Sequence, residues 1–257
     1  MRFKVRFKFG FRKLKAGIIV FLGTNCDRDT EIALNAAGFE TKFIFHTETN
    51  LSGYDLIVLP GGFSFGDYIR AGRLAKLSPA VLALREYVKR REGFVFGICN
   101  GFQILCEAGF LPGALVENVS TRFISRDERL IFNPDPVFGD LQGQGGTEEI
   151  ILPVAHKEGC FYADESELKR IEKENMVFLR YKNNPNGSLN DIAGLYDRKN
   201  RVFGMMPHPE RAVSKVLGNA DGFKIFNFIK NEILCSKSAK HCAFDVLEAN
   251  LSKRGAK

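Results

Sequence analysis

The chain has 257 residues, of which 45% are hydrophobic and 26% are charged, as is typical of a soluble globular protein with one sizeable core. No apolar run approaches the roughly 20 residues that span a bilayer, which excludes a helical membrane protein. The formal net charge is +7, but residues 1–15 hold seven basic side chains and no acidic one. Removing those seven from the 37 basic residues leaves 30, which balance the 30 acidic residues. This distribution argues against a nucleic-acid-binding domain.

The basic segment at 1–15 has three interpretations that stay open. It is a short extension of no great function, the product of an upstream start codon that is not used, or a targeting or polyanion-binding arm. A signal peptide is disfavoured because the apolar run at 16–22 is barely long enough, lacks an A-x-A-like cleavage site and is needed as the first strand.

Apolar runs and helical periodicity alternate along the chain. We predict strands at 16–22, 41–46, 56–59, 94–96, 149–153, 176–181, 192–196 and 201–205. We predict helices at 27–37, 79–91, 102–108 and 222–234, and a weakly amphipathic tail at 235–257 with one short helix at 244–251. This order indicates an α/β fold: a single-domain, doubly wound, mostly parallel sheet of the flavodoxin type with flanking helices. The strand-rich second half is expected to add antiparallel strands.

The segment Gly97-Ile98-Cys99-Asn100-Gly101 follows an apolar run and precedes an amphipathic one. This is the pattern of a nucleophile elbow, with Cys99 at the position of the hydrolase serine. The two glycines let strand and helix pass closely around a strained nucleophile. The free N–H groups at the start of the following helix favour a thiolate, which is the reactive form of cysteine.

A cysteine nucleophile needs a base and an orienting group, and Met206-Pro207-His208-Pro209-Glu210 supplies both residue types. Pro209 favours an extended backbone at His208, and residues i and i+2 of an extended segment point to the same side. We therefore expect the Glu210 carboxylate to bond the His208 imidazole. Taken alone, the motif also fits a surface turn, and His156 is a less suitable base.

The glycine-rich segment 59–68 directly follows a predicted strand and is expected beside the elbow at the carboxyl edge of the sheet. Backbone N–H groups of Gly62 and Phe63, with that of Asn100, would form an oxyanion hole; the alternative is an ordinary turn. No phosphate-binding glycine motif is present, so we predict no nucleotide site. Gln103 is either a substrate-binding residue or an exposed helix residue.

The six cysteines are scattered, without the C-x-x-C spacing of zinc or redox sites. We expect no metal site and no disulfide framework. A catalytic thiolate requires a reducing compartment, so a cytoplasmic location is expected.

Several motifs together resemble the class I (triad) glutamine amidotransferases, and among them the glutaminase subunits of phosphoribosylformylglycinamidine synthase. The segments that carry the resemblance are Gly23-Thr24-Asn25-Cys26-Asp27, Pro60-Gly61-Gly62-Phe63-Ser64-Phe65-Gly66-Asp67-Tyr68, Cys99-Asn100-Gly101-Phe102-Gln103-Ile104-Leu105, Pro153-Val154-Ala155-His156 and Met206-Pro207-His208-Pro209-Glu210-Arg211-Ala212. The similarity covers about 16–234, which suggests a basic extension at 1–15, an amidotransferase domain at 16–234 and a tail at 235–257. Both ends lack a counterpart in the family.

The resemblance implies a Cys99–His208–Glu210 triad that hydrolyses glutamine to glutamate and ammonia. In the family, ammonia passes to a large synthetase subunit that uses ATP and magnesium to amidate formylglycinamide ribonucleotide in purine biosynthesis, and a small third subunit helps to assemble the complex. No cofactor is expected on this chain itself. The alternatives are another hydrolase of the same fold, such as a γ-glutamyl hydrolase or a cysteine peptidase, and a non-catalytic binding subunit.

Overall fold

A nine-stranded sheet organises the part of the chain that the structure, a computed structural model, describes, namely residues 13–133 and 147–254. Its strands are β1 (Lys15–Val20), β2 (Glu40–Phe45), β3 (Leu56–Leu59), β4 (Phe94–Ile98), β6 (Ile124–Phe132), β7 (Glu148–His156), β9 (Val177–Tyr181), β10 (Ile192–Asp197) and β11 (Val202–Met205). A small separate sheet pairs β5 (Ala114–Val116) with β8 (Cys160–Tyr162). The helices are α1 (Asp27–Ala36), α2 (Pro79–Lys89), α3 (Asn100–Glu107), α5 (Glu165–Lys173) and α6 (Gly222–Arg254). Short 3₁₀ turns lie at Ser64–Asp67, Ala75–Leu77, Leu189–Asp191, Pro209–Arg211 and Lys215–Leu217.

The strand order is β2-β1-β3-β4-β11-β10-β9-β6-β7. The pairs from β2 to β11 are parallel, whereas β11–β10, β10–β9, β9–β6 and β6–β7 are antiparallel. The predicted fold is therefore confirmed, because the sheet consists of a parallel half and, as expected, an antiparallel half formed mainly by the second part of the chain. The first four strands follow the order of the flavodoxin type, in which ligands bind outside the carboxyl ends of the strands.

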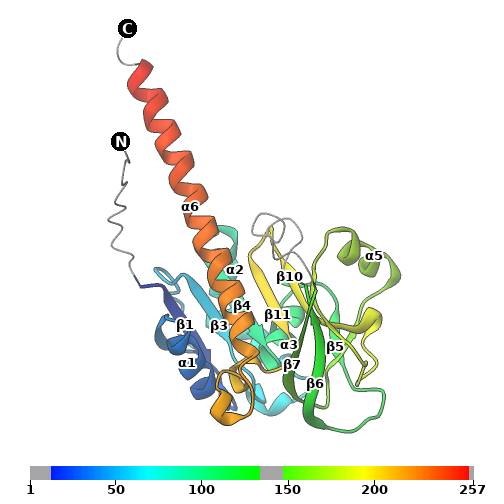
Figure 1. The fold of residues 1–257 in the computed structure, drawn as a ribbon. Coiled ribbons are helices and arrows are strands. Elements are labelled where there is room, and N and C mark those ends of the chain that lie inside the picture. The colour runs from blue at the N-terminus through cyan, green and yellow to red at the C-terminus, as the bar shows by residue number, and fades with distance from the viewer. Residues whose placement is uncertain (1–12, 134–146, 255–257) are drawn as a thin grey trace.

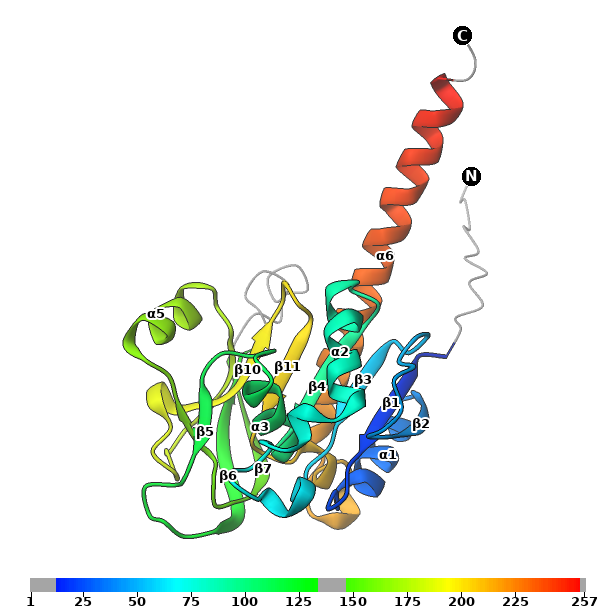
Figure 2. The same cartoon turned by 180° about the vertical axis from the view of Figure 1, so that it is seen from behind.

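Helices cover both faces of the parallel half: α1 and α6 lie on one face, and α2 and α3 on the other (Figures 1 and 2). Every residue of β3 and β4 is buried. Their continuous apolar sequences follow from this double cover, because neither face of these strands meets water.

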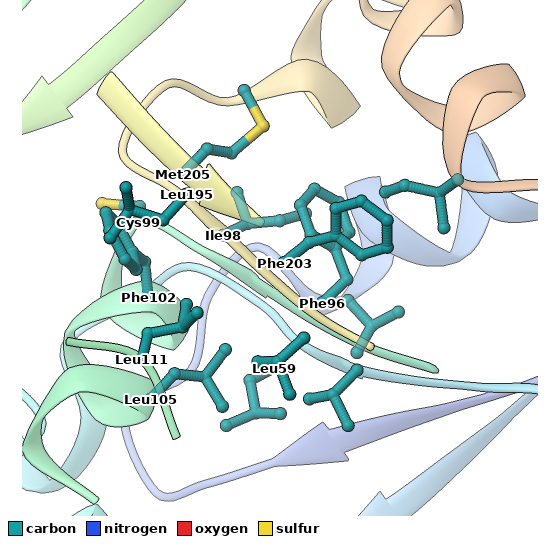
Figure 3. Close-up of a cluster of buried hydrophobic side chains, with 14 of the residues drawn as sticks. Leu59, Phe96, Ile98, Cys99, Phe102, Leu105, Leu111, Leu195, Phe203 and Met205 are labelled. Carbon is teal, nitrogen blue, oxygen red and sulfur yellow. The ribbon is translucent and has the colours of Figure 1, made fainter. Parts of the chain in front are cut away.

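The core reaches the end of β4, where Cys99 lies at one edge of a cluster of buried side chains that includes Phe102, Leu105 and Met205 (Figure 3). Cys99 itself is 5% exposed. Close packing around Cys99 leaves the turn that carries its thiol little freedom to move.

Four elements, β5, β6, β8 and α5, are absent from the predicted set. The run Ser125–Arg129 in β6 is polar and does not read as a strand, but pairing with β7 along all nine residues organises it. A local signal for α5 exists: Asp164 accepts a hydrogen bond from the Glu167 N–H at 2.8 Å, which caps the helix.

Several predicted boundaries differ from the observed ones by one to three residues, and the one near the C-terminus is far off. Helix α6 does not end at 234 but continues to Arg254, and its last turns project beyond the body of the protein (Figure 1). The reason is local, since no glycine or proline occurs between Gly222 and Gly255 to stop it. At the other end, β1 begins at Lys15 and Leu14 is already buried, so the core starts before residue 16. Residues 1–12 of the basic segment lie outside the described residues.

None of the helices in residues 13–133 and 147–254 combines the length and apolar character needed to cross a membrane.

Candidate active site

Cys99 lies between β4 and α3 in a backbone conformation that few residues adopt. Its φ of 50° and ψ of −105° fall outside the ordinary regions for a residue with a side chain. The Cys99 N–H donates to the Met205 carbonyl at 2.8 Å, and this bond to the neighbouring strand holds the turn. Strain of this kind concentrates at functional sites, where surrounding contacts maintain it. The predicted elbow is therefore present, with the thiol at the N-terminus of α3.

Both elbow glycines are required by packing. A Cβ on Gly97 would lie 2.6 Å from the Gly101 carbonyl group, and a Cβ on Gly101 would lie 1.9 Å from the Leu59 oxygen. Strand β4, helix α3 and strand β3 thus approach at distances that only glycine permits.

The His208 imidazole and the Glu210 carboxylate are in direct contact, with 2.6 Å between Nδ1 and Oε1. Both side chains are buried, and the His208 N–H donates to the Pro153 carbonyl at 2.8 Å, which ties the motif to β7. The predicted contact is correct, but the predicted extended backbone is wrong. His208 has φ −102° and ψ 87°, outside the extended region, and Pro209–Arg211 forms a 3₁₀ turn that brings Glu210 back toward the ring.

The charges around His208 favour its protonated form. Burial by itself disfavours an imidazolium, but the Glu210 carboxylate, followed by negative charge on Cys99 and the nearness of the Cys26 and Cys99 sulfurs, raises the pKa of His208 well above its usual value. Neither sulfur is aligned well enough with Nε2 to complete a hydrogen bond of ordinary geometry. By contrast, burial and then the charge of His208 lower the pKa of His156 to about 4, so His156 is neutral at pH 7.

Cys26 is a second thiol beside the same imidazole. Its Sγ accepts a hydrogen bond from Arg211 Nη2 at 3.0 Å, and it lies within 4.8 Å of a His208 nitrogen and a Glu210 oxygen. A soft divalent cation can bind to sulfur, nitrogen and oxygen donors of this kind. Here, however, His208 Nδ1 and Glu210 Oε1 are already bonded to each other. The predicted set of site residues omits Cys26, although the segment Gly23–Asp27 around it is one of the motifs that carry the resemblance.

The glycine-rich loop contacts both the first βα loop and the elbow. The Cys26 N–H donates to the Gly61 carbonyl at 3.1 Å, and the Ser64 N–H donates to Asn100 Oδ1 at 3.1 Å. The Phe63 N–H donates to the Gly23 carbonyl at 2.9 Å. In this conformation the Phe63 N–H is therefore engaged, and its role as an oxyanion donor stays a prediction that requires the loop to rearrange.

Gln103 is buried, at 6% exposure, so the interpretation as an exposed helix residue is wrong. Its Nε2 donates to the Glu158 carbonyl at 2.5 Å, and its Oε1 accepts from Asn100 Nδ2 at 2.9 Å. The same Asn100 amide donates to Asp67 Oδ1 at 3.1 Å. The helix that carries the thiol is thus linked by side-chain amides to two carboxylate-bearing segments.

Two cavities of about 260 Å³ each meet at Cys99. One is lined by Cys26, His208 and Arg211, and the other by Gln103, Asp67, His156 and Glu158; Gly62, Phe63 and Cys99 line both. A substrate with a reactive carbonyl at one end and polar groups at the other fits this arrangement, because the thiol lies between the base and a polar recess.

The family model of a CobB/CobQ-like glutamine amidotransferase domain matches residues 13–224. The chain belongs to this glutamine amidotransferase family. The matched range ends within α6, beyond the predicted triad, and its start agrees with the core beginning before residue 16.

Similar proteins include the phosphoribosylformylglycinamidine synthase subunit PurQ of Thermus thermophilus, at 46% identity over 228 residues, covering 86% of this chain and 99% of that protein. A chain in the solved structure of PurLQS from Thermotoga maritima superposes with a TM-score of 0.75 at 39% identity, covering 86% of this chain and 99% of that chain. A glutamine amidotransferase from Thermotoga maritima superposes with a TM-score of 0.52 at 15% identity, covering 87% of this chain and 97% of that chain. This last likeness shows the fold alone.

Proposed function

We propose that this chain is the glutaminase subunit of phosphoribosylformylglycinamidine synthase, in which Cys99, His208 and Glu210 release ammonia from glutamine. The observation that carries the proposal is the strained thiol at a helix N-terminus beside a buried imidazole–carboxylate pair at 2.6 Å. Likeness to PurQ over almost its whole length supports this substrate over a γ-glutamyl peptide.

In the first half of the reaction, the Cys99 thiolate attacks the side-chain amide carbon of glutamine. The carbonyl oxygen gains negative charge, which N–H groups of Gly62 and Asn100 are suited to stabilise. The His208 imidazolium then gives its Nε2 proton to the amide nitrogen, ammonia leaves, and a thioester between Cys99 and the glutamyl group remains. The carboxylate of Glu210 on Nδ1 holds the ring in the orientation for this transfer.

In the second half, water attacks the thioester carbon. Neutral His208 accepts a proton from that water, the carbon–sulfur bond breaks, and glutamate and the Cys99 thiolate are released. The raised pKa of His208 suits its first role as a proton donor, because the imidazolium is already present before the amide bond breaks.

Cys99 rather than Cys26 is proposed as the nucleophile. Cys99 lies at the start of α3 in the strained conformation that exposes a nucleophile to substrate, whereas Cys26 Sγ is engaged by Arg211 and is 1% exposed. Cys26 is better suited to hold the first βα loop against the triad.

The partners of PurQ then follow for this chain: a large synthetase subunit and a small accessory subunit, as in the assembly named PurLQS. The ammonia would be used by the synthetase, which would bind the ATP and magnesium; this chain is proposed to bind no cofactor. The thiolate chemistry suits a reducing compartment, and we propose the cytoplasm.

The test is glutamine-dependent against ammonia-dependent synthesis by the reconstituted complex. Cys99→Ala should abolish the first, by 10⁴-fold or more as an order of magnitude, and spare the second, because the cysteine only makes ammonia. His208→Ala should behave similarly. Cys235→Ala, which removes an exposed thiol on α6, is the matched thiol control and should retain glutamine-dependent activity. Full activity in Cys99→Ala would reject the assignment.

A further inference from the structure

The segments that precede four neighbouring parallel strands form a basic surface at the amino edge of the sheet. Strands β1, β3, β4 and β11 pair in this order and run in the same direction, so the residues before them lie side by side. This basic edge consists of segments 13–15, 52–55, 89–93 and 198–201, which hold eight basic side chains and two acidic ones. The basic residues are Lys13, Lys15, Lys89, Arg90, Arg91, Arg198, Lys199 and Arg201, and the acidic residues are Asp55 and Glu92.

Hydrogen bonds hold the segments of the basic edge together. The Asp55 N–H donates to the Lys15 carbonyl at 2.8 Å, and the Phe94 N–H donates to the Asp55 carbonyl at 3.0 Å. Arg201 Nη1 donates to the Arg91 carbonyl at 3.3 Å. The cations therefore lie on one continuous surface rather than on independent loops.

The positive charge of the basic edge is only partly compensated. Arg91, Lys199 and Arg201 form no ion pair with any residue in 13–133 or 147–254. Burial, followed by the positive charge of Arg91, lowers the pKa of Arg201, whose guanidinium lies over the Phe94 ring at 5.2 Å from its centroid. An anion bound at this edge would reduce the repulsion between these like charges.

The backbone does not account for the arginines at this edge. Arg91 has a φ of 52° and Arg201 a φ of 61°, both in the left-handed region. Glycine and asparagine are favoured there, and arginine is not. Their charge is therefore the property that distinguishes the arginines from residues that would fit the two turns better.

Two further basic segments leave the body of the protein at this edge. Lys237 Nζ of α6 lies 2.6 Å from Asp55 Oδ1, and Asp55 Oδ2 accepts from the Lys15 N–H at 2.8 Å. The start of β1 is therefore a neighbour of the point from which α6 projects (Figures 1 and 2). Residues 1–12 contain five basic side chains and no acidic one, and residues 238–257 contain four basic and two acidic ones. The family model matches residues 13–224 and covers neither segment.

The sequence of residues 2–12 indicates which kind of anion this edge meets. Basic side chains at positions 2, 4, 6, 8 and 12 alternate with apolar ones at 3, 5, 7, 9 and 11, and all but one of the apolar residues are phenylalanine. Basic residues are attracted to anionic lipid headgroups, while phenylalanine enters the boundary between headgroups and acyl chains. A single-stranded nucleic acid would instead follow a positively charged groove, whereas these cations come from the ends of separate loops at one edge.

We propose that the basic edge, together with residues 1–12, binds this protein to the surface of an anionic phospholipid bilayer. The candidate active site lies at the other end of the same strands. Strand β4 separates the segment of Arg91 from Cys99, and its five residues span about 17 Å. Binding at the basic edge would therefore leave Cys99 open to substrate and to partner subunits.

The test is co-sedimentation of the full chain with vesicles of phosphatidylcholine, with and without phosphatidylglycerol. Arg91→Asn with Lys199→Gln removes two charges from the basic edge, and asparagine suits the left-handed backbone at position 91. Arg28→Gln with Lys215→Gln is the matched control, because it removes the same charge from exposed positions in the first turn of α1 and after the His208 motif. Arg91→Lys with Lys199→Arg keeps the charge. The Tm of each variant shows whether it is folded under the conditions of the assay.

We expect wild type to bind vesicles that contain phosphatidylglycerol at about 0.1 M salt and to dissociate at about 1 M, because the Debye length falls from about 10 Å to about 3 Å. Arg91→Asn with Lys199→Gln should bind about tenfold more weakly or less, since each basic residue near the lipid surface contributes a factor of about five. Deleting 1–12 should weaken binding by about tenfold or more for the same reason. The control and the charge-conserving variant should bind like wild type.

Four outcomes would overturn the proposal. Equal binding to vesicles of phosphatidylcholine alone would show adsorption without recognition of the anionic headgroup. An equal loss in Arg28→Gln with Lys215→Gln would show an effect of net charge, and unchanged binding in Arg91→Asn with Lys199→Gln would exclude the basic edge. Binding of wild type to single-stranded RNA but not to vesicles would assign this edge to nucleic acid instead.

Discussion

Replacing Gly101 with alanine should displace the turn that carries Cys99 without removing any group that takes part in the reaction. The new Cβ would lie 1.9 Å from the Leu59 oxygen, 2.7 Å from its carbonyl carbon and 2.9 Å from its Cβ. Real Cβ atoms essentially never come closer than 3.0 Å to another heavy atom, so α3 and β3 must move apart by at least 1.1 Å. Two of the three atoms are backbone, which means that no side-chain rotation relieves the contact.

The expected cost combines two opposing effects. Overpacking of this kind destabilises by about 1–3 kcal/mol or more, whereas alanine in a helix is favoured over glycine by up to about 1 kcal/mol. We therefore expect a net loss of about 2 kcal/mol, which corresponds to a fall in Tm of roughly 4–8 °C for a domain of this size. A displacement of about 1 Å at the elbow should also lower kcat by about 10²-fold, because reacting groups tolerate little misplacement.

The assays are thermal unfolding and glutaminase activity at a temperature where the variant is fully folded. Gly53→Ala is the control: Gly53 has a φ of 82° and no heavy atom within 4 Å of the added Cβ. Its cost comes from the left-handed backbone alone, about 1–2 kcal/mol, with no loss of activity. Wild-type Tm and activity in Gly101→Ala would refute the steric argument.

Three further predictions concern the triad, the basic segment and the loop. Glu210→Gln should lower kcat by about 10²–10⁴-fold. Because Glu210 raises the pKa of His208, it stabilises the folded protein when His208 is protonated. The loss of unfolding free energy in the variant, measured in urea, should therefore be greatest below pH 6.5 and shrink as pH rises through the raised pKa. Deleting 1–12 should leave Tm and glutaminase activity unchanged, since the buried core begins after that range; a large loss of either would make the segment structural. The isolated chain should hydrolyse glutamine about 10²–10³-fold more slowly than the complex. The reason is that the Phe63 N–H is bonded to the Gly23 carbonyl, and the lack of one oxyanion donor slows such reactions by that factor. Equal steady-state rates would reject the idea that the partner frees this N–H.

The sequence alone determined the features that depend on neighbours along the chain. Glycines on both sides of Cys99 after an apolar run predicted the elbow, because a close strand-to-helix turn demands residues without side chains. The His208–Glu210 contact was predictable for a similar reason, since the two residues are only two positions apart. Alternating strands and helices likewise predicted the parallel half of the sheet, because short connections and buried strands restrict its topology.

The predictions that failed concern residues whose hydrogen-bond partners lie far away in the sequence. The polar run in β6 became a strand because β7 supplies its hydrogen bonds, and Gln103 became buried because the Glu158 carbonyl, 55 residues later, accepts its amide. We expected the Phe63 N–H to be free for an oxyanion, but the fold places the Gly23 carbonyl against it. Propensity and periodicity carry no information on such partners.

The composition of the site was decided by the tertiary structure. Arg211 reaches Cys26 across 185 positions of sequence, and Asp67 meets Glu158 only because the loops after different strands converge at one edge of the sheet. A sequence shows which side chains can do chemistry, but burial and the approach of distant charges set their protonation and their freedom to bind. Those quantities depend on distances through space, which only the folded chain fixes.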